Sequence, residues 1–149
     1  MSILRTNQIQ DTSGNTAMMI DDSGVVNHPA KPFWVLGLST NAQVEGTLAF
    51  DVVHKLRNAT HNSGAITILT AGVYLCTFAS NNDNTYKHFN INGSNPYAST
   101  FTQWHNGADS NTLVTPLELS VNDVVTCYMG TAGGGTYGHN TLFSGVLIG

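Results

Sequence analysis

The chain has 149 residues, enough for one domain of ordinary size together with a short terminal segment. Only 9% of its residues are charged, whereas Asn, Thr, Ser and Gly occupy 60 positions, so neutral polar groups must keep the surface hydrated. A hydrophobic share of 41% with a net charge of −4 favours a folded chain over a disordered one. The five basic residues form no cluster, which disfavours nucleic acid as a partner because phosphate binding draws on grouped Lys and Arg.

No apolar run is long enough for the core of a signal peptide or for a membrane span. We therefore expect a soluble protein that is made in the cytoplasm and does not insert into a membrane. The two cysteines, Cys76 and Cys127, each lie in an apolar, strand-like run. Buried free thiols are favoured over a disulfide bridge between them, and the bridge stays open as the alternative.

Residues 1–32 differ in pattern from the rest of the chain. Two Gly-containing turn signatures, at 11–15 and 21–24, alternate with short apolar pieces, and Pro29 and Pro32 close the segment. This pattern predicts an extended arm with short strand pieces and too little apolar surface for a core of its own. Such an arm would dock on a partner protein by adding strands to a neighbouring sheet. The candidate docking residues are Ile3, Leu4, Ile9, Met18, Met19 and Ile20.

From residue 33 onward the apolar residues come in short runs, rich in β-branched and aromatic side chains and separated by turn residues. This spacing is typical of an antiparallel sandwich or barrel. A helix over Val44–Leu56 is an alternative, because apolar residues recur there every four positions, but Gly46 weighs against it. Within 73–78 apolar residues occupy both faces, so this strand belongs in the middle of a sheet, while Phe33–Trp34 fits either the core or a subunit contact. The predicted strands are 33–38, 65–69, 72–78, 86–91, 112–119, 124–129 and 142–148.

Three of these segments carry a family resemblance. The run Gly72–Phe78 resembles the central strand of the jelly roll found in the complement one-q globular head and the tumour necrosis factor superfamily. Residues 117–125 resemble a strand, turn and strand of that family, with Asn122 in place of the usual Gly. Asn is the next-best residue where φ is positive, so the departure is mild. Residues 142–148 resemble the closing strand of the family.

The resemblance covers residues 33–149 and implies an all-β, antiparallel jelly-roll sandwich of about ten strands. It also implies a homotrimer packed around apolar axis residues. The arm, over residues 3–15, is similar to the opening of bacteriophage head-fibre and tail-fibre proteins. Together these resemblances imply a non-enzymatic structural protein located in the virion. It would be a trimeric capsid decoration or fibre module that a capsid or tail protein of the same virion holds through the arm, residues 1–32.

A second interpretation is a receptor-binding fibre tip that recognises a host surface glycan or protein. Trp104, beside His105 and Asn106, could offer a ring face and polar groups to a sugar. Tyr137 and His139 lie in a second Gly-rich loop that could contact the same receptor. For Trp104, a place in the core or in a subunit contact is favoured over sugar stacking.

Other motifs fit structure better than chemistry. The glycines between 133 and 138 match a dinucleotide-binding spacing, but no βαβ unit surrounds them. The six histidines lack metal-ligand spacing, so we expect no metal and no cofactor, although a trimer could gather one histidine from each subunit on its axis. A glycan-processing enzyme, the least favoured function, would need two paired carboxylates. No motif unites any two of the candidate acids Asp83, Asp109, Glu118 and Asp123.

Overall fold

The computed structural model of the chain describes residues 8–10, 12–14, 16–28, 30–40, 46–81, 85–95, 103–105, 110–131 and 141–149. Over these ranges every regular element is a β-strand, and none of them contains a helix that could cross a membrane. The chain divides into two compact units, Met1–Lys31 and Pro32–Gly149. The N-terminal unit therefore makes its contacts mainly within itself.

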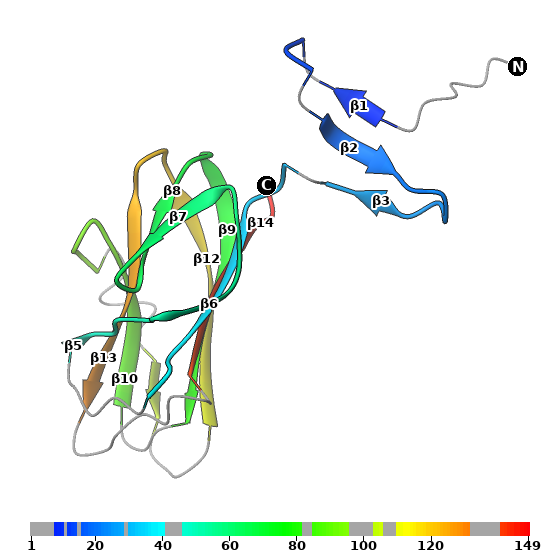
Figure 1. Cartoon of the computed structure of the whole chain (residues 1–149). Helices are drawn as coiled ribbons and strands as arrows, with labels where there is room; N and C mark the ends of the chain where they lie inside the picture. Colours follow the sequence, from blue (N-terminus) through cyan, green and yellow to red (C-terminus); the bar gives the residue numbers. More distant parts are fainter. Residues whose placement is uncertain are drawn as a thin grey trace, which may run out of the picture. The chain divides into compact units, whose positions relative to one another are not determined.

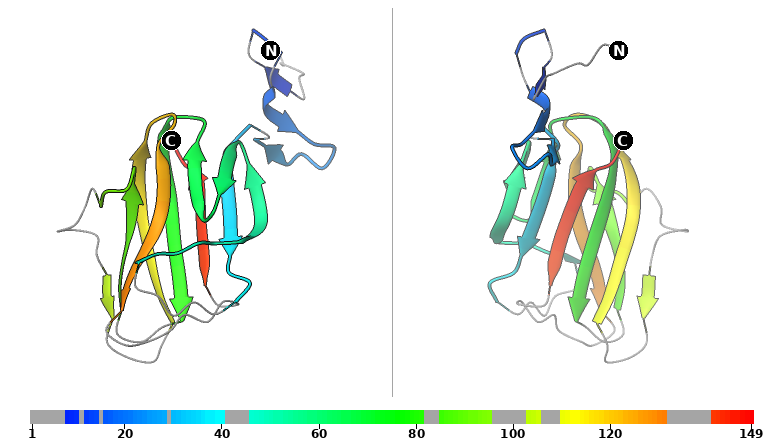
Figure 2. Two further views of the ribbon diagram at one scale, coloured as in Figure 1. Left: turned by 60° about the vertical axis from the view of Figure 1, so that its left-hand side comes forward. Right: turned by 90° about the vertical axis from the view of Figure 1, so that its right-hand side faces the viewer.

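The larger unit is an antiparallel sandwich of two sheets that face each other across one core (Figure 1, Figure 2). The five-stranded sheet has the order β12-β9-β14-β4-β6. The six-stranded sheet has the order β11-β10-β13-β8-β7, and short β5 also pairs with β13. This arrangement confirms the predicted all-β antiparallel sandwich. Its strands are β4 (Phe33–Gly37), β5 (Gly46–Thr47), β6 (Val52–Arg57), β7 (Ala59–Asn62), β8 (Ala65–Ile68), β9 (Gly72–Asn81), β10 (Thr85–Ile91), β11 (Gln103–His105), β12 (Ser110–Leu119), β13 (Val124–Thr131) and β14 (Leu142–Leu147).

All seven predicted strands are present, and β9 lies between β12 and β14, inside its sheet as expected. The helix alternative over Val44–Leu56 is wrong for the part that the structure describes, which holds β5 and most of β6. Strands β6 and β7 were missed in the sequence because each lies at the edge of its sheet. Most of their side chains are exposed, so their sequences lack the apolar alternation of a half-buried strand.

Aromatic rings fill the centre of the core. The ring of Trp34 lies 5.6 Å, centroid to centroid, from both Tyr74 and Phe143. Phe50, which precedes β6, meets Phe78 edge-on at 6.2 Å, and these non-parallel arrangements suit the ring quadrupoles. Trp34 therefore belongs to the core, which settles one half of the Phe33–Trp34 ambiguity. The largest fully buried apolar side chains are Trp34, Tyr74, Phe50, Phe78, Phe143, Leu36, Leu48, Ile66, Ile68, Leu117 and Leu119.

Gly145 on β14 makes room for the largest of these rings. It is the register partner of Trp34 on β4, so the two residues point to the same face of the sheet. A Cβ atom at position 145 would overlap the indole ring of Trp34. Gly145 is thus a packing feature of the strand.

A lysine is also buried in the sandwich. Lys87 on β10 has no exposed surface, and its Nζ donates to the carbonyl oxygen of Ser80 at 3.4 Å. The same Nζ lies 5.2 Å from the ring centroid of Phe78. Burial disfavours the ammonium ion and lowers the pKa of Lys87 to about 8, although the nearby Cys127 opposes this shift.

Both cysteines are buried free thiols, which excludes the bridge that the sequence left open. Burial raises the pKa of Cys76 to about 12, and it also raises the pKa of Cys127. Because the thiolate is the reactive form, these side chains are chemically quiet at neutral pH.

Two asparagines with positive φ shape one end of the sandwich. Asn122, in the turn between β12 and β13, has a φ of 72°, which confirms the positive φ expected at this position. Asn92 has a φ of 54°, and its side chain accepts a hydrogen bond from Val124 N–H at 2.9 Å and donates one to Asp123 at 2.8 Å. Asp123 also accepts a hydrogen bond from Ser120 N–H at 2.7 Å. This carboxylate is therefore committed to holding two turns together.

The N-terminal unit contains a small antiparallel sheet with the order β1-β2-β3. Its strands are β1 (Gln8–Gln10), β2 (Thr16–Ile20) and β3 (Val26–Asn27). In the turn between β2 and β3, a carboxylate oxygen of Asp21 accepts hydrogen bonds from Ser23 N–H at 3.0 Å and Val25 N–H at 2.9 Å, and Gly24 has a φ of 79°. The strand pieces expected in the arm thus pair with one another.

Replacing Gly145 by Ala should destabilise the sandwich by about 1–3 kcal/mol, because the added methyl group overpacks the core against Trp34. Urea unfolding, followed by tryptophan fluorescence, measures the change. Gly149→Ala is the control, since a Cβ atom at that position meets open space and should leave the midpoint unchanged. Equal midpoints for the two variants would contradict the proposed packing.

Lys87→Met should change how the free energy of unfolding depends on pH, because it removes the buried amine. In the window between about 8 and 10.5 the unfolded chain binds more protons than the folded chain, so the wild type gains stability as pH rises. The free energy of unfolding of the wild type, minus that of Lys87→Met, should therefore rise by roughly 2–3 kcal/mol between pH 7 and pH 10. Taking this difference cancels the titration of both cysteines to first order. A difference that does not change with pH would show that Lys87 is solvated.

Candidate interaction surface

The outward face of the five-stranded sheet carries exposed apolar side chains on β9, β12 and β14 and half-buried ones on β4. Register partners share a face, so residues line up in rows that cross the sheet from β6 to β12. One row is Arg57, Phe33, Val146, Leu75 and Pro116. The adjacent row is Lys55, Val35, Ser144, Thr77 and Val114. We call these two rows, together with Leu142 on β14, the sheet face.

Four aliphatic side chains of the sheet face, Leu75, Val114, Leu142 and Val146, are each between 37% and 52% exposed. Each square ångström of apolar surface left in water costs about 25 cal/mol relative to burial. Scattered exposed apolar residues are ordinary, but a contiguous group across several strands is characteristic of an interaction surface. Phe33 is half-buried on this face, whereas its chain neighbour Trp34 lies in the core, so a subunit contact through Phe33 stays a prediction.

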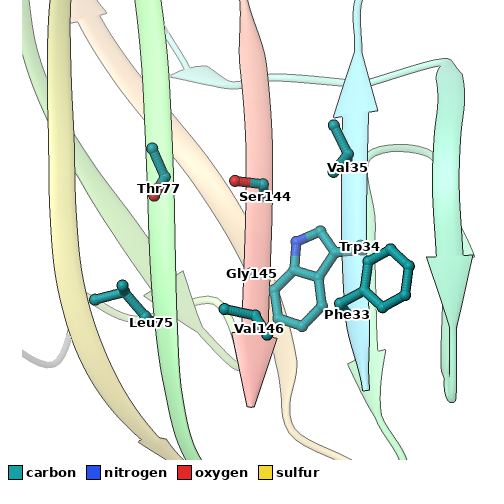
Figure 3. A pocket seen from close by; sticks show the side chains of 8 residues that line it. All are labelled: Phe33, Trp34, Val35, Leu75, Thr77, Ser144, Gly145 and Val146. Atoms are coloured by element: carbon teal, nitrogen blue, oxygen red, sulfur yellow. The ribbon is translucent and has the colours of Figure 1, made fainter. Parts of the chain in front are cut away.

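The centre of the sheet face is a shallow depression of about 290 Å³ (Figure 3). Figure 3 shows Val146 and Leu75 on adjacent strands in the lower row, and Ser144 and Thr77 in the row above them. Only Ser144 and Thr77 bring side-chain hydroxyl groups to it. The depression is lined by Phe33, Trp34, Val35, Leu75, Thr77, Ser144, Gly145 and Val146. Its shape and polarity fit an apolar side chain better than a charged or strongly polar group.

Opposite charges lie at the two edges of the sheet face. On β6, the guanidinium carbon of Arg57 lies 4.6 Å from the ring centroid of Phe33, and Lys55 follows in the next row. On β12, at the other edge of the sheet, Glu118 is exposed beside Pro116. An identical copy could therefore meet this face with its acidic edge against the basic one.

A second feature lies on the six-stranded sheet, where three aromatic side chains form a stack. The rings of His88 on β10 and Tyr128 on β13 are 4.6 Å apart with an angle of 14°, and Tyr86 lies 6.0 Å from each. Burial lowers the pKa of His88, and a hydrogen bond with Asn90 partly opposes this shift. The stack leaves only a weak signal in the sequence, because its third ring, Tyr128, comes from a strand that is distant along the chain although it pairs with β10.

The predicted receptor-contact residues are only partly described. Trp104 and His105 lie in β11, where they are the backbone register partners of Tyr86 and Thr85. This pairing brings the predicted Trp104 position next to the strand that carries the aromatic stack. Asn106, Tyr137 and His139 lie outside the described residues. The receptor role of these residues stays a prediction.

The predicted docking residues of the arm are also only partly described. Ile9 lies in β1, and Met18, Met19 and Ile20 lie in β2. Ile3 and Leu4 lie outside the described residues. Docking through this set stays a prediction.

Among the residues that the structure describes, no group of three or more His, Cys, Asp or Glu side chains could hold a metal ion. The histidines within these ranges have other environments. His61 contacts the carbonyl oxygen of Phe50 at 2.9 Å, and His88 belongs to the aromatic stack.

Comparison with known proteins defines the fold class. No protein-family model matches the chain, and no curated protein matches it. Among solved structures, the globular domain of zebrafish complement 1qA protein is similar, with a TM-score of 0.55 and 20% sequence identity. The match covers 80% of this chain and 98% of that domain. It confirms the predicted jelly-roll fold, and at this identity it defines the fold alone.

Proposed function

We propose that this protein is a non-enzymatic structural module of a bacteriophage virion, a trimeric capsid decoration or fibre component. The observation that carries the proposal is the exposed sheet face with its apolar depression. A contiguous apolar surface of this kind is characteristic of an interaction site, because a partner molecule that covers it removes it from water. We take a second copy of the same chain as the partner, because identical copies are present wherever the protein is made.

The distribution of charge favours a cyclic assembly over a two-fold dimer. In a heterologous contact, the edge strand of one copy packs against the face of the next, and the ring closes after a fixed number of copies. Such a contact can place Glu118 of one copy near Arg57 or Lys55 of its neighbour, so the opposite edges complement each other. The resemblance to the complement one-q jelly roll supports three as the number of copies.

Among the residues that the structure describes, three groups that could carry out chemistry have structural roles, whereas the candidate acids Asp83 and Asp109 lie outside them. Asp123 accepts hydrogen bonds in the turn network, and both cysteines are buried with raised pKa values. The virion assignment draws on the similarity of residues 3–15 to the opening of phage fibre proteins. It also fits a surface hydrated by neutral polar groups. In this proposal, the N-terminal unit links the trimer to a capsid or tail protein.

A receptor-binding tip is the second candidate, and the aromatic stack favours it. Tyr86, His88 and Tyr128 form an aromatic patch on the six-stranded sheet. Tyr86 is also the backbone register partner of Trp104 on β11. Aromatic side chains next to hydroxyl and amide groups suit a host glycan. The two candidates are compatible, because the stack and the sheet face lie on opposite sheets of the sandwich.

Val146→Asp should convert the trimer into a monomer. The substitution places a carboxylate at the centre of the apolar face, where it would be desolvated without a partner. Light scattering on the wild type should give about three times the chain mass of 15.9 kDa, and the variant should give a single chain mass.

Thr60→Asp is the matched control for this experiment. Thr60 has the shape of valine and is exposed on β7, at the edge of the opposite sheet. This variant should keep the trimeric mass. A wild-type monomer at micromolar concentration would refute the trimer, and a trimer that survives Val146→Asp would place the interface elsewhere.

Deleting residues 2–26 should separate assembly from attachment. The N-terminal unit and the sandwich are two compact units, so we expect the melting temperature of the sandwich to stay within about 2 °C and its trimeric mass to persist. Incorporation into particles should be lost. The experiment compares purified particles made with the full-length and the shortened chain. Particles that still carry the shortened chain would disprove attachment through the arm.

A further inference from the structure

One face of the small N-terminal sheet carries four apolar side chains among the described residues. Register pairs Ile9 with Met18 and Ile20 with Val26, and residues two apart on β2 share a side. Ile9, Met18, Ile20 and Val26 therefore lie on one face, which we call the arm face. The opposite face carries Gln8, Met19 and Asn27, which are also linked by register.

The arm face is poorly covered within its own chain. Ile9, Ile20 and Val26 are between 41% and 52% exposed, and Met18 is half-buried. A unit of about 30 residues cannot bury enough apolar surface to offset the entropy of ordering it, and units of this size usually gain stability from a partner. The arm face is thus a second apolar surface that a binding partner would stabilise by covering it.

We propose that the arm faces of three chains pack against one another within each trimer. This inference rests on the proposed trimer of the sandwich. The arm face contains no charged side chain, so identical copies can meet without burying an unpaired charge. Three symmetry-related copies of one apolar face can close around a shared axis and exclude water from all of them.

Chain continuity brings the three arm faces together. Val26 on the arm face is only seven positions before Phe33, a residue of the sheet face, so the linking chain spans at most roughly 25 Å. The carbonyl oxygen of Pro32 accepts a hydrogen bond from Leu147 N–H at 3.1 Å, which fixes the start of the sandwich beside β14. Tethers of this length give effective concentrations on the order of millimolar. A weak contact between arms would therefore form readily inside a trimer, although isolated arms would not associate.

This arrangement assigns different roles to the two faces of the arm sheet. In the proposed trimer the apolar arm faces pack against one another, while Gln8, Met19 and Asn27 face outward. A particle protein would then meet a single three-chain stem, and its contacts would be mostly polar. The arm residues expected to dock on a partner would divide, with Met19 on the outer side and Ile9, Met18 and Ile20 on the inner side.

Single cysteines on the two faces test the inference in the full-length chain. Val26→Cys places a thiol on the arm face, and Asn27→Cys places one on the opposite face of the same strand. Both positions are exposed, so neither change disturbs a core. The native cysteines are buried, and the wild type therefore supplies the background. The probe is a short bismaleimide cross-linker at micromolar protein concentration, with light scattering on every variant.

We expect Val26→Cys to form covalent dimers at least about tenfold faster than Asn27→Cys, at a rate that does not depend on protein concentration. In a trimer a bifunctional reagent can join two chains of three, so about two thirds of the chains should end in dimers. Equal rates for the two variants in an intact trimer would overturn the arm contact and leave the sandwich trimer standing. A monomeric mass for the wild type would overturn both.

Discussion

Trp34 fills the space that Gly145 leaves open, and this contact fixes how β4 and β14 pair. Because side chains alternate along a strand, the same register sends Phe33 and Val146 to the outward face. A slip of one residue would place the indole in water and the exposed valine in the core. The packing of one ring thus determines both the core of the sandwich and the composition of its sheet face.

The low charge of the chain makes the apolar sheet face important for association. A protein with 9% charged residues has few means of keeping copies apart, so its apolar surfaces decide which contacts form. The sheet face concentrates its charges at the margins, with Arg57 and Lys55 on β6 and Glu118 on β12. The arm face carries none. In both places, burial would supply the free energy of association, and charges at the margins of the sheet face would set its orientation.

Sequence patterns identified the elements with strong apolar alternation and failed where the pattern depends on distant residues. The strand from Gly72 was predicted with its central place in the sheet, and the turn at Asn122 was expected from the family resemblance. The sheet face could not be predicted, because this strand has apolar residues on both sides and its sequence does not tell whether Leu75 or Tyr74 faces the second sheet. The aromatic stack and the arm face are products of register between strands, which single-chain spacing does not encode.

The central claim is that the sheet face is covered in the native protein. Hydroxyl-radical footprinting of the intact wild type tests it by comparing two leucines of similar exposure in the single chain, Leu75 on the sheet face and Leu69 in the turn after β8. If a neighbouring copy covers the face, Leu75 should be oxidised several-fold more slowly than Leu69. Equal oxidation rates for the two leucines would contradict the account, because they would show that the sheet face remains in water.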